Sequence, residues 1–235
     1  SSTHILILSC LYTFWTAPSL MYGTTDILVR SDTIDNADAH IFLKGGKEAY
    51  YVYKKTNRRP MLPFAAQLED AEQYAVWLND VEVIENLQLI SSIISVEGER
   101  ELLKKLAQEH NYGIIDLKTN HLLGNVGFID INHLHRTAEI GIFIGNKNYW
   151  GKGYGREALS LLLDYAFKKL NLHNILLRVY DFNRRAVACY EKVGFKRIGE
   201  IRESLIRNME YHNIILMDIL PADFYETNPQ YKIEK

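Results

Sequence analysis

From Pro60 onward, apolar positions follow helical spacing in some segments and form short strand-like runs in others. Helical spacing predicts helices at 68–80, 98–109, 156–170 and 183–193. Apolar runs bounded by polar or glycine-containing connections predict seven strands, at 61–66, 112–117, 122–131, 138–144, 174–179, 195–201 and 211–220. Three successive strands followed by alternating strands and helices predict a mixed sheet with helices on its faces.

The first 58 residues differ from the remainder and form an extension to which the sequence assigns no function. Weak strand-like alternation occurs at 24–29 and 50–54, and a basic segment ending at Pro60 is expected to be a linker. The apolar run at 5–15 is shorter than the roughly 20 residues of a membrane span, and no Lys or Arg precedes it as in a signal peptide. The expected divisions are an extension at 1–58, one domain at 59–221 and a C-terminal tail at 222–235.

Composition narrows the classes of function. The 27 Lys and Arg residues nearly balance the 29 Asp and Glu residues, which argues against a nucleic-acid binder. Cys10 and Cys189 leave one disulfide possible, but a reduced, cytoplasmic protein is the better expectation. His133 and His135 share one strand face without a nearby Cys or acidic partner, so no metal site is expected.

Three glycines, at 151, 153 and 155, lie between a predicted strand and a predicted helix. Glycine lets backbone N–H groups turn toward a ligand, and a helix N-terminus favours anions, so the loop suits a phosphate. Lys152 and Arg156 add positive charge. The spacing fails the P-loop pattern, and Arg156 stands where the dinucleotide fingerprint needs its last glycine. A glycine turn without a ligand stays the alternative.

Two segments resemble the GNAT N-acetyltransferases. The stretch YWGKGYGREA at 149–158 resembles the acetyl-CoA loop of that family, although Trp150 stands where Gln or Arg is usual. The stretch NRRAVACYEKVGF at 183–195 looks like the family's N-x-x-A-x-x-x-Y-E-K-x-G-F segment. The resemblance covers about 60–221. Residues 149–153 and 211–213 are most similar to the branch that acetylates ribosomal-protein N-termini, which usually has Asp where Asn213 stands.

The resemblance implies an α/β (α+β) fold of GNAT type, with a mixed, mostly antiparallel central sheet and helices on both faces. It implies acetyl transfer from acetyl-CoA to a primary amine by direct attack in a ternary complex, without a metal or a covalent enzyme intermediate. The implied contacts to coenzyme A are one strand end, the glycine loop and one polar residue beyond it: Ile142, Phe143, Ile144, Trp150, Gly151, Lys152, Gly153, Tyr154, Gly155, Arg156 and Asn183.

Two residues are expected to move protons. An amine with a pKa of about 10.4 must lose a proton before it attacks a thioester, and a carboxylate can accept that proton. Glu139, on the strand that borders the cofactor, is the candidate base, with a hydrogen-bonding orienter as the open alternative. Tyr190 matches the family's tyrosine acid for the departing thiolate, and a core aromatic is the alternative.

The acceptor pocket is expected near the first helix and the last strand pair. The residues expected there are Trp77, Asp80, Glu82, Glu85, Asn86, Tyr211 and His212. Acidic groups at this place would suit a cationic amine. The expected acceptor is a peptide or protein N-terminus or a small amine. The alternatives are a polyamine or aminoglycoside acetyltransferase and a non-catalytic acyl-CoA-binding module. No nucleic acid or membrane partner is expected, and a homodimer is left open.

Overall fold

The computed structural model describes residues 61–65, 70–87, 93–106, 110–116, 119 and 121–232. The predicted strands at 24–29 and 50–54, the apolar run at 5–15 and Cys10 lie outside these residues. Within the described ranges, no helix is long and apolar enough to cross a membrane. The same ranges contain no group of three or more His, Cys, Asp or Glu side chains that could hold a metal ion, at His133 and His135 or elsewhere.

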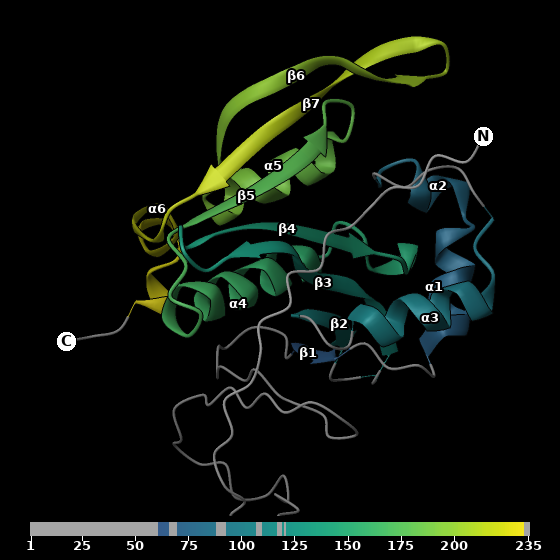
Figure 1. Ribbon diagram of the computed structural model, residues 1–235, viewed down its shortest axis with the longest axis horizontal. Helices are drawn as coiled ribbons and strands as arrows, with labels where there is room; N and C mark the ends of the chain where they lie inside the picture. Colours follow the sequence, from purple (N-terminus) through teal and green to yellow (C-terminus); the bar gives the residue numbers. More distant parts are fainter. Residues whose placement is uncertain are drawn as a thin grey trace, which may run out of the picture. The chain divides into compact units, whose positions relative to one another are not determined.

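Seven strands form one sheet in the order β1-β2-β3-β4-β5-β7-β6 (Figure 1). Their bounds are β1 Met61–Ala65, β2 Asn111–Asp116, β3 His121–Asn132, β4 Thr137–Ile144, β5 Asn174–Tyr180, β6 Lys196–Arg207 and β7 Glu210–Ile219. Every neighbouring pair is antiparallel except β4 and β5, which are parallel. The predicted mixed and mostly antiparallel sheet is therefore confirmed.

The main helices also lie where the periodicity predicted them. Their bounds are α1 Ala71–Leu78, α2 Val81–Ile84, α3 Val96–Leu106, α4 Tyr154–Lys168, α5 Arg184–Val193 and α6 Pro221–Thr227. α2 and α6 are additions that the sequence did not predict. α6 begins with Pro221 at its first position, where a proline fits, and it places Phe224 fully inside the core. The stretch that we predicted to be a tail thus contributes Phe224 and Tyr231 to the core.

The helices cover both faces of the sheet, as predicted. The larger core contains side chains from α4, α5 and α6 together with Ile140 and Leu177 of the sheet. The smaller core contains Tyr74 and Trp77 of α1, Val83 of α2 and Leu103 of α3. Along β4, Ile142 and Ile144 pack against the larger core, whereas Phe143 packs against the smaller one. This alternation is that of a strand covered on both faces.

β4 and β5 pair over a short distance only. Their register runs from Thr137 opposite Asn174 to Glu139 opposite Leu176, and within the described sheet no pairing between the two strands follows. The second half of β4, at 140–144, is paired to β3 alone. Its other backbone edge faces a gap between the two strands. Such an edge can bind an extended, amide-rich ligand as an added strand would.

Candidate functional site

A cavity of about 770 Å³, here called the central cavity, connects the two faces of the sheet at the β4–β5 gap. On one side it is lined by the glycine loop and by α5, and on the other by side chains of α1, α2 and α3. Of the residues predicted to bind coenzyme A or to move protons, all except Lys152 line it. The Lys152 ammonium lies 5.8 Å from the centre of the Tyr149 ring. The structure therefore brings together nearly all of the residues selected from the sequence for cofactor binding and proton transfer.

The glycine loop has the backbone conformation that a phosphate cradle needs. Gly151 has φ of 69° and Gly153 has φ of 92°, a region that other residues seldom adopt. Gly153 is the N-cap of α4, and the first bond within the helix runs from the Glu157 N–H to the Gly153 carbonyl at 3.1 Å. A Cβ at Gly151 or Gly153 would meet no atom within 4 Å. The helix N-terminus therefore faces open space, and the loop fits a diphosphate.

Trp150 links this loop to β4. Its indole Nε1 donates a hydrogen bond to the Ile144 carbonyl at 2.6 Å. The Arg185 guanidinium lies 3.8 Å from the centre of the Trp150 ring, in a cation–π contact. Trp150 stands where the family usually has Gln or Arg. In this chain the cation at that place is Arg185 of α5, which also lines the central cavity and which the sequence reasoning missed.

Two predicted residues of the segment at 183–195 line the wall formed by α5. The Asn183 side chain caps this helix by accepting a hydrogen bond from the Ala186 N–H at 3.1 Å. Tyr190 is 9% exposed and lines the central cavity. Burial, with the nearby Cys189, raises the pKa of the Tyr190 hydroxyl. Tyr190 therefore keeps its proton at neutral pH, as a general acid must.

Glu139 forms a two-point ion pair with Arg178 of β5. Arg178 Nε lies 3.1 Å from Glu139 Oε1, and its NH2 group donates to Oε2 at 3.1 Å. Glu139 is the last β4 residue paired with β5, and Arg178 lies two residues beyond its partner Leu176, so the ion pair bridges the start of the gap. Because both carboxylate oxygens are engaged, accepting a proton would cost this ion pair. The geometry favours the orienting alternative, while the role of Glu139 as base stays a prediction.

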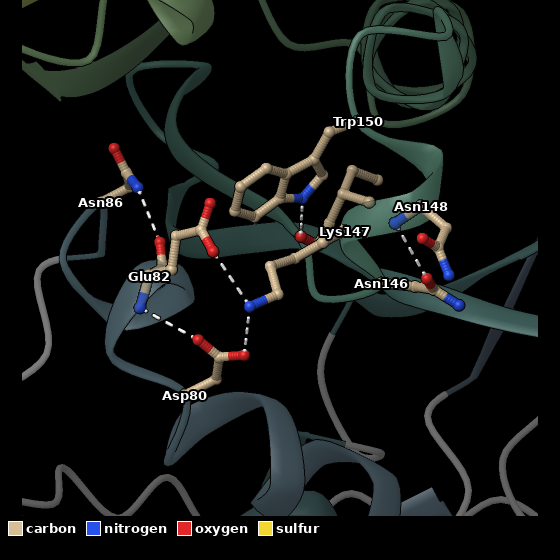
Figure 2. A network of polar contacts seen from close by, with 8 residues as sticks. Asp80, Glu82, Asn86, Asn146, Lys147, Asn148 and Trp150 are labelled. Carbon is tan, nitrogen blue, oxygen red and sulfur yellow. Dashed lines mark hydrogen bonds and ion pairs between the residues drawn. The ribbon is translucent and has the colours of Figure 1, made fainter.

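The three acidic residues expected to attract the amine are each paired with a Lys or Arg of the chain, two of them with Lys147 (Figure 2). The Lys147 ammonium lies 2.7 Å from Asp80 Oδ2 and 3.0 Å from Glu82 Oε2. Hydrogen bonding from Lys147 lowers the pKa of Asp80. Glu85 pairs with Arg207. These ion pairs hold α2 against its neighbours. Among the seven predicted acceptor residues, only Asn86 lines the central cavity.

The remaining three predicted acceptor residues lie elsewhere. Trp77 is buried in the smaller core, where it packs against Tyr74 and Phe143. The His212 ring lies 3.1 Å from the Asp181 carboxylate. Tyr211 is exposed. None of the three lines the central cavity.

A carboxylate that the sequence reasoning missed does line the central cavity. Glu99 of α3 is 3% exposed, and its Oε2 is buried without a hydrogen-bond partner. Burial raises the pKa of this carboxyl group. Glu99 precedes Leu102, Leu103 and Leu106 by three, four and seven residues, so it occupies the apolar stripe of its helix. An acidic residue in an apolar stripe was the signal that would have revealed it.

Glu99→Gln should stabilise the protein at neutral pH by about 1–2 kcal/mol, because an amide costs less to bury than an unpaired carboxylate. Below the ordinary Glu pKa of about 4.3 both states hold the proton, so the gain vanishes. It grows as the pH rises from there through the raised pKa of the folded state and is constant above it. Denaturant unfolding across pH measures it. Glu97→Gln, on the exposed side of α3 in a pair with Arg100, is the matched control. An equal response of the two variants would contradict the expectation.

Comparisons with known proteins agree with this geometry. The chain is 38% identical over 116 residues to a spermidine N(1)-acetyltransferase of Vibrio cholerae, which covers 49% of this chain and 66% of that protein. It is 29% identical over 103 residues to a Bacillus subtilis protein provisionally named a ribosomal N-acetyltransferase, covering 44% of this chain and 56% of the other. A crystal structure of the Vibrio cholerae spermidine N-acetyltransferase with CoA and spermine superposes with a TM-score of 0.64 and 30% identity. It covers 70% of this chain and 97% of that one.

The acetyltransferase (GNAT) domain model matches residues 63–196, which is more than half of the chain. Members of this family transfer an acetyl group from acetyl-CoA to an amine. The predicted family, fold, enzyme class and cofactor are thereby confirmed at the level of the family. With a glycine loop capping α4, a parted β4–β5 pair and a buried tyrosine on α5, this chain belongs to the GNAT N-acetyltransferases.

Proposed function

We propose that this protein acetylates a primary amine of a small linear polyamine, with acetyl-CoA as the acetyl donor. One observation carries the proposal: a single cavity joins the glycine loop, through the β4–β5 gap, to a pocket lined by buried side chains of α1 and α3. A slender flexible amine fits a pocket lined in this way. The relatives named spermidine acetyltransferases support the same acceptor class.

The residues of the cavity have separate roles in this proposal. The glycine loop holds the diphosphate of the cofactor, and the β4 edge at 142–144 pairs with its amide-rich arm. Acetyl-CoA supplies the activated acetyl group when it is bound. A backbone N–H near Phe143 or Ile144 stabilises the negative charge that develops on the carbonyl oxygen. Tyr190 Oη donates its proton to the departing thiolate.

Glu139→Gln distinguishes a base from an orienter. Because both Glu139 oxygens bind Arg178, we expect kcat to fall less than the roughly 100-fold typical of losing a base, with the shape of the pH–rate profile retained. Steady-state kinetics across pH provides the measurement. A larger loss, together with disappearance of the acidic limb of the profile, would instead identify Glu139 as the base.

The acceptor class is tested by measuring CoA release from the full chain with polyamines, amino sugars and short peptides. We expect the highest kcat/KM with polyamines. The second candidate is a peptide N-terminus, which the similarity of residues 149–153 and 211–213 to the ribosomal-protein branch favours. Preferential turnover of peptides would select that candidate. Cofactor binding without turnover of any amine would indicate a non-catalytic acyl-CoA-binding module.

The homodimer, the cytoplasmic location and the division into an extension at 1–58 and a domain at 59–221 stay predictions. Exposed apolar side chains on β6 and at the β6–β7 turn, including Ile198, Ile206 and Met209, support a homodimer. β6 and β7 extend as a long hairpin beyond the neighbouring end of β5 (Figure 1). Sedimentation of the full chain measures the oligomeric state.

A further inference from the structure

The α3 end of the central cavity holds a buried carboxylate without a cation. Glu99 lines the cavity, and its Oε2 has no hydrogen-bond partner. In the part of the chain that the structure describes, no Lys or Arg forms an ion pair with it. A buried carboxylate is costly unless a partner of opposite charge joins it. A cationic ligand would be such a partner.

Two polar residues that line the same cavity direct their own donors to backbone carbonyls. Tyr74 donates its hydroxyl proton to the Gly124 carbonyl at 3.2 Å, so this proton is not directed into the cavity. Asn111 donates from its amide nitrogen to the Phe128 carbonyl at 3.4 Å, which leaves its amide oxygen as an acceptor. Both residues line the cavity. An ammonium group, with three donors and no acceptor, matches this set.

Two glycines of the sheet border the central cavity between the gap and Glu99. Gly127 of β3 and Gly141 of β4 are direct cross-strand partners, and both line the cavity. A Cβ at Gly127 would lie 2.2 Å from Asn111 Oδ1, so only glycine permits the observed Asn111 side chain. Glu139 precedes Gly141 by two residues on β4, and its ion pair with Arg178 lies where the gap begins. Asn111 and Ile129 pack over the two glycines, so the stretch of cavity from the gap toward Glu99, here called the track, runs along these side chains.

We propose that Glu99 binds the distal ammonium of a linear diamine or polyamine whose other terminal amine reacts at the β4–β5 gap. This inference rests on the proposed acetyltransferase function and makes Glu99 its specificity-determining residue. The track crosses about one and a half to two and a half strand spacings, or roughly 7–12 Å. An extended chain covers about 3.5 Å for every three bonds, so this span corresponds to roughly six to ten bonds between the two nitrogens. That is the length range of extended diamines and of triamines.

The test is a series of linear α,ω-diamines of increasing carbon number, with the linear monoamine of equal length as the reference for each. With the full chain and saturating acetyl-CoA, the kcat/KM ratio of diamine to monoamine should reach a maximum at one length within the predicted range. In Glu99→Gln this maximum should fall at least roughly 30-fold, because the distal ammonium loses its buried partner. The loss should appear mainly in KM, since Glu99 does not touch the reacting amine.

Glu97→Gln is the matched control on the exposed face of the same helix, and it should retain the maximum. An unchanged length profile in Glu99→Gln would overturn the role of Glu99 while leaving the acetyltransferase proposal intact. A wild-type protein that binds acetyl-CoA and acetylates no amine would overturn the proposed function, and the role of Glu99 with it. A wild-type profile without a preferred length would also overturn the inference.

Discussion

Gly153→Glu should abolish acetyl-CoA binding, with at least a roughly 100-fold rise in Kd. The substitution places a carboxylate in the open space in front of the α4 N-terminus, where we place the diphosphate. Two negative groups then compete for the same backbone donors. Calorimetric titration of the full chain with acetyl-CoA measures this loss directly.

A backbone effect must be separated from this electrostatic one. Gly153 has φ of 92°, so any side chain at this position strains the loop by about 1–3 kcal/mol. Gly153→Ala is the matched control because it carries the same strain without the charge. We expect Gly153→Ala to weaken binding far less than Gly153→Glu. Equal affinity in wild type and Gly153→Glu would show that the diphosphate lies elsewhere.

Tyr190→Phe should lower kcat by roughly 100-fold, within the range typical of a general acid, and should leave the Kd for acetyl-CoA nearly unchanged. The hydroxyl is buried in the cavity wall, and its raised pKa keeps it protonated at neutral pH. Removing only the oxygen keeps the ring, which packs against Phe195 at a centroid distance of 6.0 Å. Stopped-flow single-turnover kinetics would isolate the chemical step.

Tyr165→Phe tests whether any buried tyrosine hydroxyl has this effect. Tyr165 of α4 is also buried in the larger core but does not line the central cavity. We expect its substitution to change stability rather than kcat. A single-turnover rate for Tyr190→Phe that equals the wild-type rate would remove Tyr190 from the mechanism.

The fold was predictable because most of its main helices and strands show a hydrophobic periodicity within their own segment of sequence. Apolar periodicity located β2 to β5 and α4 within a few residues, since these elements bury one face or both. β6 extends to Arg207, beyond the predicted Ile201, because it is exposed along nearly its whole length and has no apolar alternation to reveal its end. α2 has only four residues, and its Asp80 cap, rather than any periodicity, defines its start.

The candidate site was predictable where the chemistry lies within one segment. The glycine loop and the segment around Tyr190 are continuous in the sequence, so their resemblance to a family could be seen directly. The ion-pair partners that change the expected role of a residue lie far from it in the sequence. Arg178 comes 39 residues after Glu139, and Lys147 comes 65 residues after Glu82. Pairing across strands and loops depends on register and on loop paths, neither of which a single sequence encodes locally.

The second half of β4, at 140–144, which is paired to β3 alone, has one further consequence. Its Phe143 side chain packs with Trp77 and Tyr74, while Ile142 and Ile144 on the opposite side border the glycine loop and α5. No bonds from β5 hold this half in place within the described sheet, so a change of volume on either side moves the same short length of backbone. We therefore expect that substitutions selected by directed evolution for a change in amine selectivity will also change the affinity for acetyl-CoA, and the reverse.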